Sequence, residues 1–290
     1  MPYPLAKLAY GLRRRLADLA TPTERYNLQI AAGNPSICPP KLQLIQQTVK
    51  HPWFSRKNGT ISVTDDFWAW TSQDVMPLSF GRDSLISCNQ DFNLQYLNHK
   101  DLSSEIFDNF LYHPTGIELQ DCCVSKQFLE TLQKKLQINQ VIYFTIEENT
   151  NNSYTPNFTD LLTFWPHLRI VEFLRCEMSK NWIDEILQFP EHKLMALLII
   201  SAKNQFVQFQ FNHFLKFLKA QPQGFTITFY VSDDAGKLAS YFVRLKQYLD
   251  QNLVKGDLPK RHEIFTFVDI IYATSERCSW YYLPSKTDVV

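Results

Sequence analysis

Leucines recur at intervals of three and four residues along the first part of the chain. They are Leu5, Leu8, Leu12, Leu16 and Leu19. This spacing places all of them on one face of a helix. Residues 21–24, Thr-Pro-Thr-Glu, predict the start of a second helix, because Thr is a good N-cap, Pro suits the first helical position and Glu can bond back to the cap amide. Two short helices cannot bury both of their apolar faces, so this stripe needs the rest of the chain or a second protein.

After residue 102, short apolar segments alternate with helical patterns at intervals of roughly 25 to 30 residues. The strand candidates are residues 117–119, 141–146, 168–174, 194–200 and 225–231. Helical patterns begin near Phe128, Trp182, Val207 and Tyr241. Strands that alternate with helices of this length favour parallel pairing with helical crossovers. We therefore expect an α/β solenoid whose five strands lie adjacent and parallel in one sheet, with helices on the convex side.

The segment between these two regions is rich in aromatic residues. Apolar positions in residues 42–49 predict a third helix. Trp53, Phe54, Phe67, Trp68 and Trp70 follow among turn formers. Such a density of aromatic side chains needs a core or an interface to cover it, which favours a compact, strand-rich connector. The expected organisation is a helical module over residues 1–50, a connector over 51–101 and a repeat-like domain over 102–290.

Composition narrows the classes of function. The chain has 290 residues, with 29 Lys and Arg against 29 Asp and Glu, so no excess charge favours nucleic acid. No apolar run approaches the roughly 20 residues that span a membrane, and early charges such as Lys7 argue against a secretory signal. Six scattered cysteines without metal spacing indicate free thiols in a reducing compartment, which predicts a cytoplasmic or nuclear protein.

No motif for catalysis or for a cofactor is found. The eight glycines stand singly and form no phosphate-binding loop, and the seven histidines are isolated from one another. Asp65-Asp66 and Asp233-Asp234 are adjacent carboxylates, which would point to opposite faces of a strand. We expect no nucleotide, flavin or structural metal and no catalytic residue.

The leucine stripe, the Thr-Pro helix start and the helix after it together resemble an F-box, over residues 4–47. The F-box is the module by which substrate adaptors dock onto the Skp1 subunit of cullin-RING ubiquitin ligases. The family usually has Leu-Pro where this chain has Leu8-Ala9, and Lys or Arg where it has Gly33-Asn34. The resemblance implies a Skp1-like partner that contacts the five leucines together with Tyr26 and Leu28.

The order of elements after residue 102 resembles the F-box-associated domains of the large nematode F-box families. Residues 168–176 echo a leucine-rich repeat, and residues 179–183 with 194–197 fit the polar segment and strand of those domains. Together the two resemblances imply a non-catalytic adaptor, in which an F-box-like module precedes an irregular leucine-rich-repeat-like α/β solenoid. An unknown protein target would bind the concave strand face, or loops at one edge, of the solenoid. Charged residues expected to contact it are Glu118, Arg169, Glu172 and Arg175.

Two other classes of protein stay open from the sequence. Repeat proteins need caps, so the N-terminal helices could cap the solenoid of a protein-binding scaffold or inhibitor and never meet Skp1. The other class is a diverged enzyme without a recognisable site.

Overall fold

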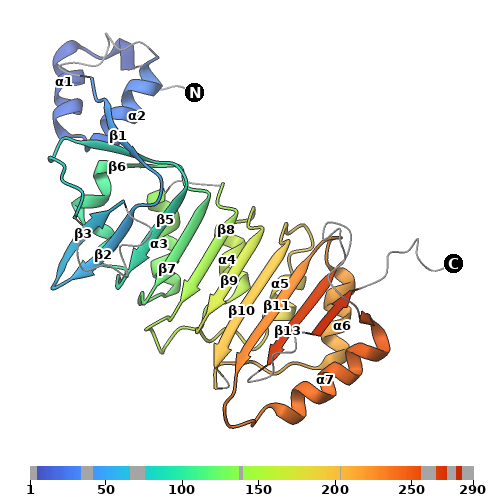
Figure 1. Cartoon of the computed structure of the whole chain (residues 1–290). Helices are drawn as coiled ribbons and strands as arrows, with labels where there is room; N and C mark the ends of the chain where they lie inside the picture. The colour runs from blue at the N-terminus through green and yellow to red at the C-terminus, as the bar shows by residue number, and fades with distance from the viewer. Residues whose placement is uncertain are drawn as a thin grey trace.

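The fold is built around two sheets, a large one that is mostly parallel and a small one that is parallel. The computed structural model describes residues 5–33, 42–65, 76–136, 140–202, 204–255, 266–272 and 279–282. A helix pair precedes the sheets in the chain and projects from one end of the large sheet (Figure 1). The protein is therefore a mixed α/β protein, as the alternation of strand and helix patterns predicts.

The helix pair begins as the leucine spacing predicts. A short 3-10 turn, η1 (Leu5–Lys7), leads into α1 (Tyr10–Leu19), and α2 (Pro22–Ala32) follows. The Thr21 hydroxyl accepts a hydrogen bond from the Glu24 amide at 3.3 Å, and the Glu24 carboxylate accepts one from the Thr21 amide at 2.8 Å. This reciprocal cap confirms the predicted start of α2.

The large sheet contains 11 strands in the part of the chain that the structure describes. Its order is β12-β14-β13-β11-β10-β9-β8-β7-β5-β2-β3. The bounds are β2 (Trp53–Lys57), β3 (Thr60–Thr64), β5 (Asp91–Gln95), β7 (Gly116–Gln120), β8 (Tyr143–Glu147), β9 (Ile170–Leu174), β10 (Ala196–Ala202), β11 (Thr226–Ser232), β12 (Val254–Lys255), β13 (Phe267–Tyr272) and β14 (Ser279–Tyr282). In this order the strands between β13 and β2 pair in parallel, whereas β12, β14 and β3 at the two edges pair antiparallel. The five predicted strands are therefore confirmed as parallel neighbours in one sheet.

The small sheet is parallel and consists of β1 (Ile45–Val49), β4 (Leu85–Cys88) and β6 (Phe110–Tyr112). Each of its strands precedes a strand of the large sheet in the chain: β2, β5 and β7. The helix predicted over residues 42–49 is wrong. The β-branched residues Ile45, Thr48 and Val49 suit a strand, and pairing with β4 accompanies full burial of Val49.

After β7, the elements between consecutive strands of the large sheet are helices and no longer strands of the small sheet. They are α3 (Lys126–Leu136), α4 (Phe158–Phe164), α5 (Trp182–Leu187), α6 (Phe211–Ala220) and α7 (Ala239–Asn252). The helices α3 to α6 lie on one face of the large sheet and leave its other face uncovered by helices (Figure 1). Two 3-10 turns, η3 (Asp101–Ser103) and η4 (Glu105–Asn109), lie between β5 and β6.

One hydrophobic core runs between the large sheet and these elements. Alternate strand residues point into it, such as Val171 and Phe173 on β9, while their neighbours point to the opposite face of the sheet. The Trp182 ring of α5 lies 5.1 Å from Phe217 of α6 and 6.4 Å from Phe229 of β11. These contacts join consecutive strand and helix units into one body.

The aromatic segment after residue 51 is part of this same body. The ring of Phe54 on β2 lies 5.1 Å from Phe92 and 4.8 Å from Phe107. Strand β2 also pairs with β5, which pairs with β7 of the repeat region. The sheet therefore continues across the expected boundary at residue 101. Phe67, Trp68 and Trp70 lie outside the described residues.

Candidate functional site

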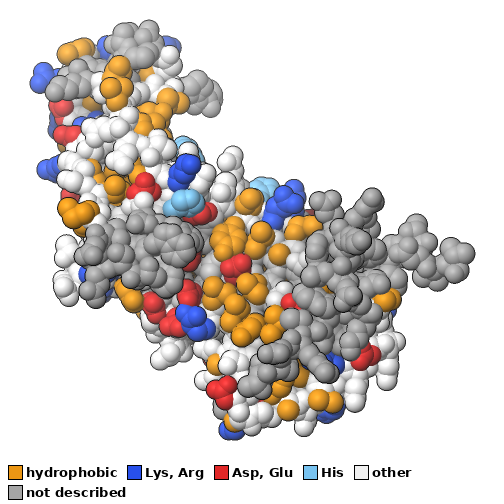
Figure 2. Space-filling model, viewed as in Figure 1, with side chains coloured by type: hydrophobic (Ala, Val, Ile, Leu, Met, Phe, Trp, Pro, Cys, Tyr) orange, Lys and Arg blue, Asp and Glu red, His pale blue; other side chains and the backbone are white. Residues whose placement is uncertain are grey.

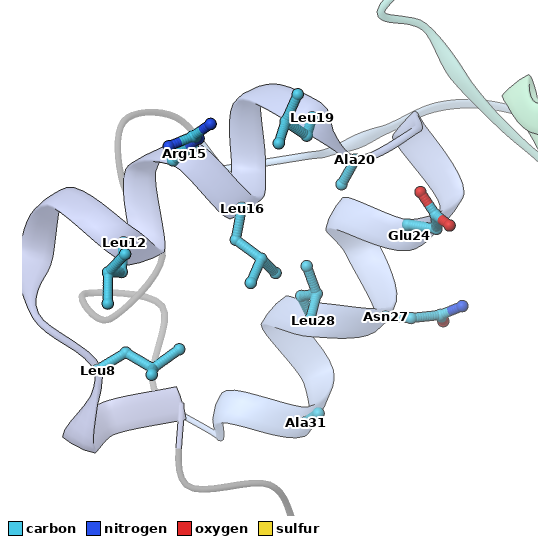
Figure 3. Close-up of a pocket in the computed structure, with 10 residues that line it drawn as sticks. All are labelled: Leu8, Leu12, Arg15, Leu16, Leu19, Ala20, Glu24, Asn27, Leu28 and Ala31. Carbon is cyan, nitrogen blue, oxygen red and sulfur yellow. The ribbon is translucent and has the colours of Figure 1, made fainter.

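An apolar groove lies between α1 and α2 and has a volume of about 780 Å³. We call it the leucine groove; its lining residues are Leu8, Leu12, Arg15, Leu16, Leu19, Ala20, Glu24, Asn27, Leu28 and Ala31 (Figure 3). Leu16 and Leu28 point toward each other from the two helices, and Leu8 and Leu12 close one end. The structure thus brings together five of the seven residues that the F-box resemblance assigns to the partner.

The leucines of α1 remain on the surface. Leu12, Leu16 and Leu19 are 55%, 38% and 77% exposed. Leu8 and Leu28 are half-buried, and so is Tyr26, which does not line the groove. Leu5 is 7% exposed and belongs to η1, which contacts α2. The structure therefore buries Leu5 against the helix pair, whereas the leucines of α1 line a groove that is open to the solvent.

The opposite side of α2 attaches the helix pair to the small sheet. The Thr23 hydroxyl donates to the backbone oxygens of Asp108, at 2.8 Å, and Phe110, at 3.1 Å. Arg25 forms an ion pair with Asp83 at 2.6 Å. These partners lie where β6 and β4 begin, so α2 runs across the amino ends of the strands.

The third contact of α2 reaches the start of β1. The Gln29 side chain donates to the backbone oxygen of Gln43 at 2.9 Å and accepts from its amide. Gln43 in turn donates to the backbone oxygen of Asp83 at 3.0 Å. All of these contacts are polar and use residues outside the groove, so the leucine groove stays open.

Basic residues border the groove on α1. Arg15 lines it and is exposed. Arg14 lies 3.9 Å from Asp18 one turn later, a distance typical of a weak surface pair. Glu24 of α2 also lines the groove and is exposed, so the groove combines an apolar floor with side chains of both charges at its rim.

The face of the large sheet that no described helix covers is a second candidate surface, which we call the open face. Its residues align across the strands because the pairing is in register. One row holds Asn93, Glu118, Thr145, Glu172, Leu198 and Thr228, from β5 to β11. Two of the predicted target contacts, Glu118 and Glu172, therefore lie in one row on this face.

The acidic residues of the open face influence one another. Tyr143 donates to the Glu172 carboxylate at 2.8 Å, and Thr145 donates to it at 3.3 Å. Burial, followed by the negative charges of Glu147, Asp91 and Glu172, raises the pKa of Glu118 to about 7. Glu118 is thus a half-buried carboxyl in a negative environment.

The two predicted arginines lie at opposite ends of β9. Arg175 follows the strand, adopts a positive φ of 48° and forms ion pairs with Glu147 and Glu148. Arg169 precedes the strand and is exposed, while its backbone oxygen accepts bonds from Met195 and Ala196. Only Arg175 is therefore joined to the acidic residues of the open face.

Sequence reasoning missed the apolar half of the open face. Ile170 and Tyr230 are 37% and 44% exposed, and Leu174, Leu198 and Ile200 are half-buried beside them. Figure 2 shows hydrophobic side chains gathered over the middle strands, with acidic and basic side chains next to them. The sequence does place these residues at alternate positions of the predicted strands. Only the in-register pairing of the strands shows that they adjoin one another on one face.

Metal-ligating side chains and cysteine thiols are two kinds of group that can carry reactive chemistry. No group of three or more His, Cys, Asp or Glu side chains among them has the arrangement of a metal site. Burial raises the pKa of Cys88 and Cys122 to about 12 and that of Cys176 to about 11, so these thiols stay protonated and weakly nucleophilic.

Among the described residues, no helix is both long and apolar enough to cross a membrane. Comparison of the chain with models of known families, with curated proteins and with solved structures finds no match.

Proposed function

We propose that the chain is a non-catalytic adaptor, which binds a Skp1-like subunit of a ubiquitin ligase through the leucine groove and a protein target through the open face. The observation that carries this proposal is the exposure of Leu12, Leu16 and Leu19 beside a helix that is anchored through its other side. An exposed apolar surface of this kind is typical of a docking site.

The mechanism of such an adaptor is proximity. Holding a target next to a charged conjugating enzyme raises the effective concentration of the target's lysines, and no chemistry by the adaptor is required. The fold supports this role, because strand and helix units stacked in chain order resemble a leucine-rich-repeat solenoid and leave a broad face uncovered by helices.

The capped scaffold is less well supported. A cap would cover the edge of the first repeat, whereas α2 crosses the amino ends of β1, β4 and β6. The edge of the large sheet next to β2 is occupied by the antiparallel strand β3 instead. Burying the leucines of α1 within the chain would also be expected of a cap, and they are exposed.

The test is co-expression of the full chain with a Skp1-like protein, followed by size-exclusion chromatography. We expect a one-to-one complex that Leu12→Asp and Leu16→Asp abolish, because each places an unpaired charge in the apolar contact. Val243→Asp is the matched control, since Val243 is an exposed apolar residue on α7. A wild-type chain that elutes as a monomer and ignores the Skp1-like protein would contradict the adaptor and favour the capped scaffold.

A further inference from the structure

We propose that the open face recognises a protein segment that carries a lysine or arginine beside apolar side chains. This inference deepens the proposed function and rests on it, because it names the class of target that the adaptor would present. The cation would bind the acidic half of the open face, and the apolar side chains would cover its hydrophobic half.

The acidic half is a cluster of carboxylates around Glu118. Glu118 and Glu172 lie two strands apart in one row, which separates their backbones by roughly 10 Å. Asp91 and Glu147 lie in the rows on either side of this one. A Lys or Arg head group entering between these side chains could contact more than one carboxylate.

Gly116 lets the Asp91 carboxylate approach this cluster. It lies between Asp91 and Tyr143 in the first row of the open face. A Cβ atom at Gly116 would lie 2.5 Å from Asp91 Oδ1 and 3.1 Å from Tyr143 Cδ1. The Asp91 carboxylate therefore leans over β7, in space that a side chain would otherwise fill.

The side-chain oxygen of Asn93 is a second observation, because this buried acceptor lacks a hydrogen-bond donor. Its side chain is 2% exposed, and its Oδ1 atom has no hydrogen-bond partner. The Nδ2 atom donates to the backbone oxygen of Pro52 at 3.4 Å, on the side of β2. Asn93 pairs in register with Glu118 on β7, so the two residues are neighbours in one row of the open face. A buried acceptor without a donor is costly, so a ligand that brings N–H groups would satisfy it.

The neighbouring carboxylates already have partners, whereas the Glu118 carboxyl forms no hydrogen bond or ion pair with another described residue. Asp91 contacts His51 at 2.7 Å, and Glu147 pairs with Arg175. The raised pKa of Glu118 agrees with this, because burial and nearby negative charge disfavour its ionised form. A cation from a target would reverse that effect and pair with the ionised carboxylate.

The hydrophobic half lies within reach of the same bound segment. Tyr230 is on β11, four strands from Glu118 on β7, a distance of roughly 19 Å. An extended peptide spans this with about six residues. Ile170 and Leu198 lie between these two points. The acidic charge of the surface excludes a segment of the same sign and selects a basic one.

The test uses fluorescent peptide libraries and the full chain, with fluorescence anisotropy as the readout. The first library fixes one Lys or Arg and places apolar residues at alternate positions after it. The second replaces the basic residue with Glu, and the third replaces the apolar residues with Ser. We expect the first library alone to bind, with affinity that falls as salt is added.

Variants of Glu118 make the test specific. Glu118→Gln should weaken binding of the first library roughly tenfold or more, because the paired charge is lost. Glu118→Lys should shift the preference toward the Glu-containing library. Glu191→Gln removes an exposed carboxylate that precedes β10 and should leave binding unchanged. Equal binding of all three libraries, or binding indifferent to both Glu118 variants, would overturn the inference.

The experiments distinguish failure of the adaptor proposal from failure of the inference about its target. Glu118→Lys should still form the complex with a Skp1-like protein, because Glu118 does not line the leucine groove. Loss of library selectivity in a chain that binds Skp1 overturns only the inference about the target. Selective peptide binding by a chain that ignores Skp1 upholds the recognition surface and overturns the adaptor.

Discussion

Replacing Leu19 and Leu5 by alanine should separate partner binding from folding. Leu19 is 77% exposed, whereas Leu5 is 7% exposed. Full burial of a leucine contributes about 1.5–3 kcal/mol, so covering Leu19 with a partner would contribute about 1–2 kcal/mol. Leu19→Ala should therefore raise the Kd for a Skp1-like protein by roughly five- to thirtyfold.

On stability, Leu5→Ala should have the larger effect and Leu19→Ala the smaller one. Leu19→Ala removes atoms already in water and should change the free energy of unfolding by at most about 0.5 kcal/mol. Leu5→Ala opens a cavity beside α2 and should lower the stability of the helix pair by about 2 kcal/mol or more. Calorimetric titration measures the first effect and urea denaturation, followed by far-UV circular dichroism, measures the second. Equal destabilisation by both substitutions would show that the leucine groove is part of the core, and would refute this reasoning.

Three further predictions concern the rest of the chain. Thr23→Val should lower stability by about 1–3 kcal/mol in urea denaturation, because the backbone oxygens at the start of β6 lose their donor; an unchanged midpoint would contradict this anchoring. Trp182→Ala should cost about 3–5 kcal/mol by the same assay, since its ring is buried among those of α6 and β11. Because the pKa of Glu118 is raised from 4.5 to about 7 in the folded chain, ionising it opposes folding. Wild-type stability should thus decline as pH rises through that window, and Glu118→Gln should flatten the decline; parallel pH profiles would rule this out.

The periodic parts of the fold could be predicted from the sequence, and the local exceptions could not. Apolar strand segments at regular spacing identify β7 to β11, since burial on a parallel sheet demands them. Residues 42–49 have an apolar spacing that suits a helix, but pairing with β4 decides the outcome. Helix α4 was missed because its apolar face is short, although Asn157 caps it by accepting from the Asp160 amide at 2.8 Å.

The two candidate surfaces also differ in how far the sequence predicts them. The leucine groove is a local feature of consecutive helices, so its leucines could be found from spacing alone, apart from the inward turn of Leu5. The open face is assembled from residues more than twenty positions apart, and its chemistry depends on register. Glu118 and Glu172 were named as separate charges. Asn93 lies outside the predicted strands, and Tyr230 occupies an alternate position of one predicted strand, whose neighbours only the pairing reveals.

The anchoring of α2 has a consequence for the order of folding. Thr23 bonds to backbone oxygens 85 and 87 positions later in the chain. On a ribosome, α1 and α2 therefore emerge long before the residues that hold them in place. The contacts of α2 with Gln43 and Asp83 can form earlier, but until β6 has been synthesised the helix pair lacks the two Thr23 bonds, and its leucines face the solvent from an incompletely anchored module. Contacts of such long range close late and slow folding, so the nascent chain has an interval in which those leucines invite chaperones or aggregation.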